Sequence, residues 1–162
     1  LELSRIESGN MSFHCEDCSA HHFAETVYQT HQVIILPPVE FIKEFPDEDV
    51  TIHIDRMRLT QVITNFLGNA KKFTSQGHIK LGYFCDKEKK EIHFFVEDTG
   101  AGIPKEELQM IFERFYKRNE FVQGVGLGLA ISKVIVEKMN GHIDVQSEVN
   151  KGSRFTAVLP YL

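Results

Sequence analysis

Residues Val122 to Lys133 read Val-Gln-Gly-Val-Gly-Leu-Gly-Leu-Ala-Ile-Ser-Lys, three glycines alternating with apolar residues before a helical pattern begins. Glycines in this register let the backbone approach a ligand closely, and the first turn of the following helix offers unpaired N–H groups with a partial positive charge. A polyphosphate group is the natural ligand for such a segment. Glycines also collect at ordinary turns, so Gly124, Gly126 and Gly128 form either a phosphate site or a plain helix start.

Composition favours one globular domain. The chain has 162 residues, of which 42% are hydrophobic, enough to bury a single core. Its 18 Lys and Arg residues are scattered and outnumbered by 23 Asp and Glu residues; the net charge of -5 argues against a nucleic-acid partner. No apolar run approaches the roughly 20 residues that cross a bilayer, and no signal peptide opens the sequence. We therefore expect a soluble domain.

The three cysteines do not form a disulfide framework, and their odd number fits a reducing compartment. Cys15 and Cys18 have the spacing of a zinc-binding pair, with His14, His21 and His22 nearby. The second ligand pair of a structural zinc site is missing, and a change from strand to helix within this segment scatters the side chains. Ordinary thiols are therefore favoured over a zinc site.

The residue pattern predicts an α/β (α+β) two-layer sandwich, a mixed and mostly antiparallel sheet with helices on one face. The opening residues 1–10 read as the end of a longer helix, stopped by a Gly-Asn pair. The predicted strands are Met11 to Cys15, Glu40 to Phe45, Thr51 to Ile54, His78 to Phe84, Glu91 to Glu97, Ile143 to Ser147 and Ser153 to Leu159. The predicted helices run from the cap Ser19 to Val33, from Asp55 to Phe73, from Lys105 to Tyr116, and from the glycine-rich stretch to Met139.

The helix from Asp55 to Phe73 has a polar edge beside its apolar stripe. The stripe consists of Leu59, Val62, Ile63, Phe66, Leu67 and Ala70. At about 100° per residue, Asn65, Asn69 and Lys72 follow one another along the flank of that stripe. This flank is either a solvated surface or a binding edge, because amide oxygens suit Mg²⁺ and a lysine supplies a point charge for phosphate.

Asp98 stands at the end of a predicted buried strand and is followed closely by Gly100 and Gly102. A carboxylate in this position can accept a hydrogen bond from an exocyclic amine such as that of adenine. The alternative is a β-turn in which the aspartate accepts hydrogen bonds from its own backbone.

Two aromatic residues, Phe112 and Phe115, share a face of the predicted helix from Lys105 to Tyr116. We expect them to anchor the core or a lid rather than to contact a ligand. The segment Asn119 to Val125 lacks periodicity and is predicted to be a mobile loop.

Four of these segments, in this order, resemble the motifs of sensor histidine kinases. Gln61 to Thr74 resembles the asparagine box, Asp98 to Ile103 the first glycine box, Phe112 to Lys117 the phenylalanine box, and Gly124 to Leu129 the second glycine box. The resemblance runs from about residue 55 to the end of the chain. It implies the ATP-binding catalytic domain of such a kinase, with the Bergerat-type sandwich shared by DNA gyrase, MutL and a heat-shock chaperone.

The resemblance also implies a role for each matching residue. Asp98 would bind the adenine amine, Phe73 and Ile103 would flank the ring, and Gly100 and Gly102 would open the pocket.

At the phosphate end, the resemblance makes Asn69 the Mg²⁺ ligand, with Asn65 and Lys72 near the phosphates. A lid formed by Asn119 to Gln123 would cover them, and Lys117 or Arg118 would reach the γ-phosphate. The glycine-rich residues implied at this end are Gly124, Gly126, Leu127, Gly128 and Leu129.

Two absences sharpen the expected mechanism. Superfamily members that hydrolyse ATP carry a general-base glutamate four residues before the metal-binding asparagine, and Asn65 occupies that place here; its amide cannot accept a proton at neutral pH. None of the 8 histidines has the His-Glu-x-x-x-x-Pro setting of the family's phosphoryl acceptor. We therefore expect slow hydrolysis and an acceptor histidine outside this chain.

The sequence thus predicts a protein histidine kinase domain that passes the γ-phosphoryl group of Mg-ATP to a histidine on a helical hairpin. The resemblance implies a dimerisation domain bearing that histidine and a response regulator as partners, with a homodimeric full-length protein and a monomeric isolated domain. The domain would be cytoplasmic, and membrane anchoring of the whole protein stays open. Two alternatives are a nucleotide-gated interaction module without transfer and a serine kinase of the anti-sigma type.

Overall fold

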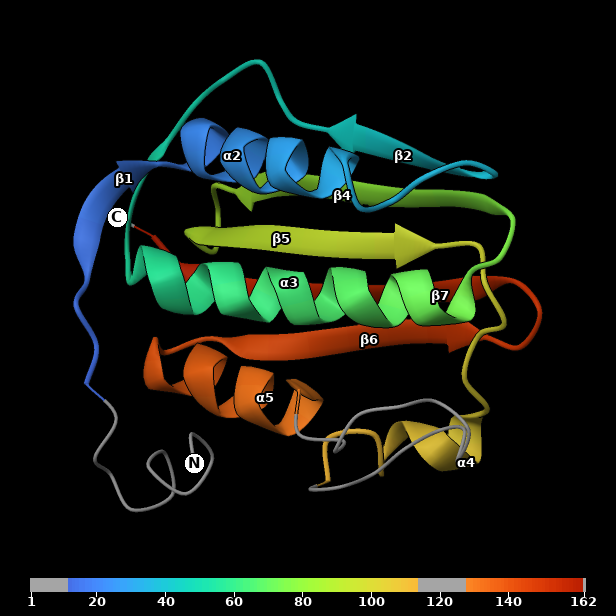
Figure 1. Cartoon of the computed structure of the whole chain (residues 1–162). Helices are drawn as coiled ribbons and strands as arrows, with labels where there is room; N and C mark the ends of the chain where they lie inside the picture. Colours follow the sequence, from blue (N-terminus) through green and yellow to red (C-terminus); the bar gives the residue numbers. More distant parts are fainter. Residues whose placement is uncertain (1–11, 114–127, 162) are drawn as a thin grey trace.

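Strands and helices alternate along the chain in the computed structural model, which describes residues 12–113 and 128–161 (Figure 1). The strands are β1 (Glu16–Ser19), β2 (Val39–Glu44), β3 (Thr51–Ile54), β4 (Gly77–Asp86), β5 (Glu91–Asp98), β6 (His142–Glu148) and β7 (Gly152–Pro160). The helices are α2 (Ala20–Gln32), α3 (Arg56–Phe73), α4 (Lys105–Leu108) and α5 (Gly128–Lys138). Each helix described here is too short or too polar to span a bilayer. The helix end predicted in residues 1–10 lies outside the described residues.

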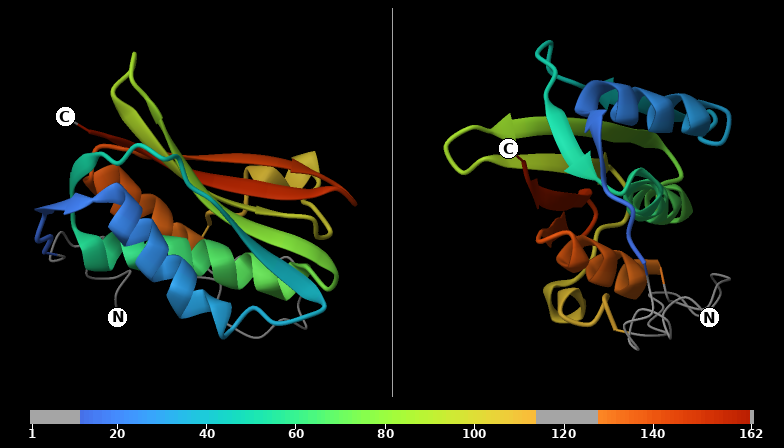
Figure 2. Two further views of the ribbon diagram at one scale, coloured as in Figure 1. Left: turned by 90° about the horizontal axis from the view of Figure 1, so that it is seen from above. Right: turned by 90° about the vertical axis from the view of Figure 1, so that its left-hand side faces the viewer.

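A five-stranded sheet forms one layer, in the order β2-β4-β5-β7-β6. β2 runs parallel to β4 and the other neighbours are antiparallel. α2, α3 and α5 cover one face of this sheet (Figure 1, Figure 2). β1 and β3 form a separate antiparallel pair. The predicted mixed, mostly antiparallel two-layer sandwich is confirmed.

The core lies between the sheet and α3. The apolar stripe predicted for this helix is buried along its whole length, at Leu59, Val62, Ile63, Phe66, Leu67 and Ala70. The Phe66 ring lies 5.4 Å from the ring of Phe155 on β7. Burying a large apolar side chain contributes about 1.5–3 kcal/mol relative to leaving it exposed. Contacts of this kind therefore fix α3 on the centre of the sheet.

Side-chain caps set the starts of the two long helices. Asp55 accepts hydrogen bonds from the backbone N–H groups of Arg58 at 3.1 Å and His14 at 2.9 Å. The Ser19 hydroxyl accepts from His22 N at 3.0 Å. Caps of this type stabilise a helix by about 1 kcal/mol. The predicted Ser19 cap is confirmed, and Asp55, predicted as the start of its helix, also caps it.

The first strand lies later in the chain than predicted. Strand structure was expected from Met11 to Cys15, but residues 12–15 are irregular and β1 begins at Glu16. In the pairing with β3, Glu16 stands opposite Ile54. Strand formation depends on its neighbours more than on local preference, so the distant partner selects which residues become extended.

The helix predicted from Lys105 to Tyr116 is also shorter in the described residues. α4 ends at Leu108, and the chain continues in turns such as the one closed by Met110 N and Glu107 O at 2.9 Å. Pro104 at its start provides no side-chain cap. A short uncapped helix nucleates poorly, so the pattern of apolar residues is not enough to extend it.

Tyr83 on β4 buries a hydroxyl that has no hydrogen-bond partner in the described part of the chain, and burial raises the pKa of Tyr83 to about 12. An unpaired buried hydroxyl costs about 1–3 kcal/mol, so Tyr83→Phe should leave the free energy of unfolding unchanged or raise it by about 1 kcal/mol. The unfolded chain releases the tyrosine proton first, near pH ~10, so the natural chain should lose stability above this pH while the variant lacks that loss. Urea unfolding at neutral and alkaline pH checks both effects; destabilisation of the variant at neutral pH would contradict them.

Candidate nucleotide site

α3 presents the three polar residues predicted along its edge. Asn65 and Asn69 are half-buried and Lys72 is exposed. Asn65 Nδ2 donates to Gly128 O and to Ser132 Oγ, both at 3.0 Å. The two acceptors belong to the first turns of α5. The edge of α3 therefore lies against the helix that follows the glycine-rich stretch (Figure 1).

Asp98 ends β5 as a buried carboxylate, with 9% of the residue exposed. Its Oδ1 accepts a hydrogen bond from Gly100 N at 2.8 Å. Removal from water raises the pKa of Asp98, while the backbone N–H groups of Gly100 and Ser153 oppose that rise. A buried carboxylate can only accept hydrogen bonds when ionised, so it favours a ligand that brings a donor.

Thr74, the residue after α3, places a buried hydroxyl beside Asp98. Its Oγ1 lies close enough to lower the pKa of the carboxyl group, yet it forms no well-aligned hydrogen bond within the described residues. A buried polar atom in this state costs about 1–3 kcal/mol. A polar group of a ligand would relieve that cost, so Asp98 and Thr74 fit the polar edge of a heterocyclic base.

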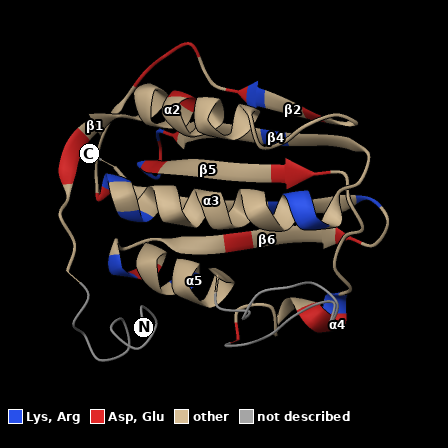
Figure 3. Ribbon diagram, viewed as in Figure 1, with Lys and Arg blue, Asp and Glu red and all other residues tan. Residues whose placement is uncertain are grey.

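Two glycines hold the loop after β5 against its neighbours. A Cβ at Gly100 would lie 2.3 Å from Phe73 O, and a Cβ at Gly102 would lie 2.0 Å from Glu148 O. Ala101 N donates to Phe73 O at 3.2 Å. The end of α3 therefore contacts this loop directly. Figure 3 shows the basic last turn of α3 and the acidic end of β5 at the same end of the molecule.

Several predicted site residues lie on the C-terminal half of α3 or contact it, whereas others lie farther along the adjoining loop and on α5. Phe73 is half-buried as the last residue of this helix. Ile103 is 8% exposed, and its backbone N–H donates to Ser147 Oγ at 2.7 Å. Leu129 packs against the core from α5. Predicted residues that lie outside the described ranges are Lys117, Arg118, the lid Asn119 to Gln123, Gly124, Gly126 and Leu127.

Three polar residues of this region did not emerge from the sequence. Ser132 is fully buried, and its hydroxyl donates to Gly128 O at 2.8 Å; its place four residues after Gly128 in a helix is a local signal for this bond. Ser153 stands opposite Asp98 in the sheet, which only the strand register reveals. Thr74 is distinguished by its burial, which depends on packing.

Residues 54–162 match the family of histidine kinase-, DNA gyrase B-, and HSP90-like ATPases. The chain belongs to this family. Two relatives support the histidine kinase branch predicted from the motifs. The sensor histidine kinase WalK of Bacillus subtilis is 34% identical over 166 residues, which cover 99% of this chain and 27% of WalK. The sensor protein SrrB of Staphylococcus aureus is 44% identical over 110 residues, which cover 65% of this chain and 19% of SrrB.

Solved histidine kinases share the fold of this ATPase-family chain. Full-length ShkA in complex with AMPPNP superposes with a TM-score of 0.90 at 27% identity, covering 99% of this chain and 34% of ShkA. The nucleotide-free catalytic domain of the histidine kinase ThkA gives a TM-score of 0.81 at 28% identity, covering 92% of this chain and 97% of that domain. The predicted sensor histidine kinase resemblance and its Bergerat-type fold are confirmed. The chain spans about a quarter or less of the two sensor proteins.

Proposed function

We propose that this chain is the ATP-binding catalytic domain of a two-component sensor histidine kinase, transferring the γ-phosphoryl group of Mg-ATP to a histidine outside the chain. The observation that carries the proposal is that two segments meet α3, the start of α5 and the loop after Asp98. Asn65 bonds to Gly128 beside the glycine-rich stretch, and Phe73 bonds to Ala101 in the loop after Asp98. The sensor kinase relatives and the AMPPNP bound in ShkA support this assignment.

At the base end, Asp98 accepts a hydrogen bond from the exocyclic amine of adenine. Its burial removes competing water, which strengthens this bond and penalises a ligand without a donor. The Thr74 hydroxyl supplies a second polar contact. Phe73 and Ile103 flank the adenine ring with apolar surface. Gly100 and Gly102 have no side chains, so the backbone of their loop lies close to the ring.

At the phosphate end, Asn69 provides the amide oxygen for Mg²⁺, and Asn65 and Lys72 lie on the same edge of α3. Mg²⁺ held by Asn69 would supply positive charge that offsets the charge of the phosphates. The other proposed contacts are Gly128 and Leu129 on α5 and, outside the described residues, Lys117, Arg118, Gly124, Gly126 and Leu127.

Asn65 makes this site a phosphoryl donor rather than an efficient hydrolase. Its amide has no basic group to activate water, and its Nδ2 is already bonded to α5. The chain therefore holds ATP while a histidine on a neighbouring helical hairpin attacks the γ-phosphate in line. Catalysis comes mainly from positioning and charge neutralisation.

The remaining assignments concern the whole protein. We propose that residues 1–10, outside the described ranges, belong to the dimerisation region and that residues 11–162 form the catalytic domain. The histidine-bearing dimerisation domain of the same protein and a response regulator receiver domain are the proposed partners. The full-length protein would be a homodimer with this domain in the cytoplasm, and the isolated domain a monomer.

Transfer to a separate hairpin tests the function directly. This chain, a histidine-bearing hairpin domain and ATP labelled on the γ-phosphate should yield a labelled hairpin, and the label should be lost in acid but kept in alkali, as expected for phosphohistidine. A hairpin lacking the acceptor histidine is the control. Nucleotide binding without transfer would support an interaction module instead, and an acid-stable label would support a serine kinase.

Asn69→Ala should abolish the tightening of nucleotide binding by Mg²⁺ and leave weaker, metal-independent binding. Titration with an ATP analogue, with and without Mg²⁺, measures the metal-independent affinity and its increase by Mg²⁺. Thr64→Ala provides a matched control because Thr64 is exposed on the same helix away from the predicted edge. If the Asn69 variant keeps the Mg²⁺ effect, the metal ligand lies elsewhere.

A further inference from the structure

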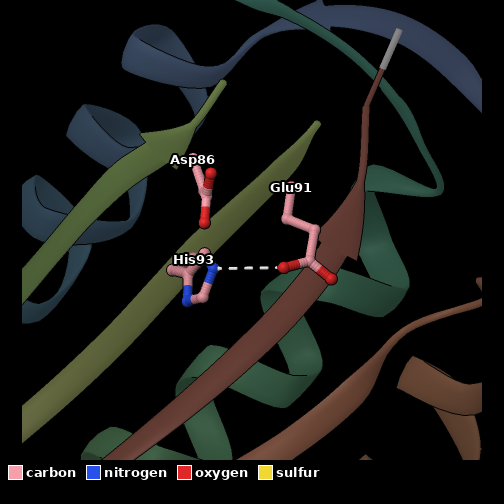
Figure 4. A group of neighbouring side chains, drawn as sticks. All are labelled: Asp86, Glu91 and His93. Atoms are coloured by element: carbon pink, nitrogen blue, oxygen red, sulfur yellow. Dashed lines mark ion pairs between the residues drawn. The ribbon is translucent and has the colours of Figure 1, made fainter. Parts of the chain in front are cut away.

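The face of the sheet opposite the helices carries a second cluster of chemically active side chains. Along β5, Ile92 and Phe94 are buried, so alternation places Glu91 and His93 on the other face. Asp86, at the end of β4, stands opposite Glu91 across the hairpin. Figure 4 shows the three side chains gathered at this end of the hairpin. Because Asp98 ends the same strand at its far end, the cluster is separate from the nucleotide site.

The three side chains have the spacing of metal ligands. Each offers one ligand atom, and these atoms lie within 4.8 Å of one another. His93 Nε2 lies 3.7 Å from Glu91 Oε1, too far for a hydrogen bond. Zinc bonds of about 2.0–2.1 Å in a tetrahedron place neighbouring ligand atoms about 3.3 Å apart. Small side-chain rotations would therefore close the cluster around one ion.

Two of the side chains are already held in place. The Phe84 ring stacks on the His93 imidazole, with centroids 4.5 Å apart and planes 20° apart. Asp86 Oδ1 accepts hydrogen bonds from the backbone N–H groups of Glu88 and Lys89, both at 3.1 Å. Such supporting contacts orient ligands before a metal arrives.

The imidazole nitrogen that faces the carboxylates forms no hydrogen bond within the described residues, and its ion-pair contact with Glu91 is long, at 3.7 Å. This nitrogen, His93 Nε2, is shielded from solvent. A shielded ring nitrogen without a hydrogen bond is costly, and metal coordination would satisfy it. This observation is independent of the spacing of the three residues. Among the turn lysines, Lys87 pairs with Glu48 at 2.9 Å, so it is directed away from the cluster.

We propose that Asp86, Glu91 and His93 form a binding site for a divalent transition-metal ion of the Zn²⁺ type. Two carboxylates balance the charge of the ion, and the imidazole favours a transition metal over Mg²⁺ or Ca²⁺. Water completes the coordination. The ion links the two strands of the β4–β5 hairpin, so it stabilises the domain without taking part in nucleotide binding.

Zinc titration by calorimetry tests the site, using the Cys15→Ser chain as parent because Cys15 and Cys18 are free thiols that could also take zinc. The expected result is one Zn²⁺ per chain, with affinity at least tenfold weaker in His93→Gln and in Asp86→Asn. His142→Gln is the matched control: His142 lies 3.5 Å from Asp144 but belongs to no cluster of three ligands in the described residues.

Cobalt provides a second readout, because Co²⁺ bound to the histidine should show visible ligand-field bands that His93→Gln abolishes. Circular dichroism verifies that each variant is folded. If His93→Gln does not fold, Asp86→Asn still tests the site, because its amide oxygen can accept the same hydrogen bonds from the turn. Stoichiometric binding that only the cluster variants weaken supports the site. Equal weakening by His142→Gln, unchanged affinity in both cluster variants, or adventitious weak binding only would overturn it.

Discussion

Asp98→Asn is expected to weaken ATP binding by about 5- to 150-fold, which corresponds to about 1–3 kcal/mol. The amide keeps the shape of the carboxyl group but places a donor where the adenine amine needs an acceptor, so one buried group is left unpaired. The buried position of Asp98 makes that mismatch costly, because water cannot replace the lost bond. Calorimetric titration of both proteins with an ATP analogue measures the difference.

Acidity offers a second test of the same residue. Because burial raises the pKa of Asp98, the carboxylate should take up its proton at a higher pH than an ordinary aspartate as the solution is acidified. As Asp98 becomes protonated, the nucleotide affinity of the natural chain should fall. The difference in affinity between the natural chain and Asp98→Asn should therefore become smaller at acidic pH. Asp144→Asn, an exposed change on β6, is the control. Equal affinities of the Asp98 variant and the natural chain would remove Asp98 from the site.

Gly102→Ala should lower the free energy of unfolding by about 2–5 kcal/mol. Gly102 has a φ of 73°, and a Cβ there would lie 2.0 Å from the carbonyl oxygen of Glu148. The left-handed conformation costs a side chain about 1–2 kcal/mol, and overpacking adds about 1–3 kcal/mol. Urea unfolding measures the sum, and nucleotide binding should weaken as the loop after Asp98 shifts.

Gly68→Ala is the matched control for this substitution. Gly68 lies inside α3, and a Cβ there would meet nothing within 4 Å. The same chemical change should raise stability by about 0.5–1 kcal/mol, because alanine loses less conformational entropy in a helix than glycine does. A Gly102 variant as stable as the natural chain would show that the loop relaxes freely.

Much of the fold could be predicted because its signals are local. The stripe of α3 repeats at helical spacing, and Asp55 and Ser19 cap their helices through residues three positions away. Errors arose where the partner was distant or the element short. β1 is set by its pairing with β3, and α4 stops after four residues without a side-chain cap.

The same distinction between local signals and distant partners applies to the candidate site. The order of motifs predicted Asn65, Asn69 and Asp98 as site residues, since each stands at a recognisable place in its own helix or strand. The sequence did not predict the hydrogen bond of Asn65 to Ser132 or the pairing of Asp98 with Ser153, because both join segments that are far apart in the chain.

The sequence by itself determined most of the helices and strands, and it marked Asp98 as a candidate acceptor, because hydrophobic period, caps and glycines act over a few residues. Only the tertiary structure decided that Asn65 reaches α5, that the Thr74 hydroxyl is buried beside Asp98, and that Asp86 joins Glu91 and His93 from across the hairpin. Those contacts follow from packing α3 on one face of the sheet and from strand register, which place side chains that no local pattern connects.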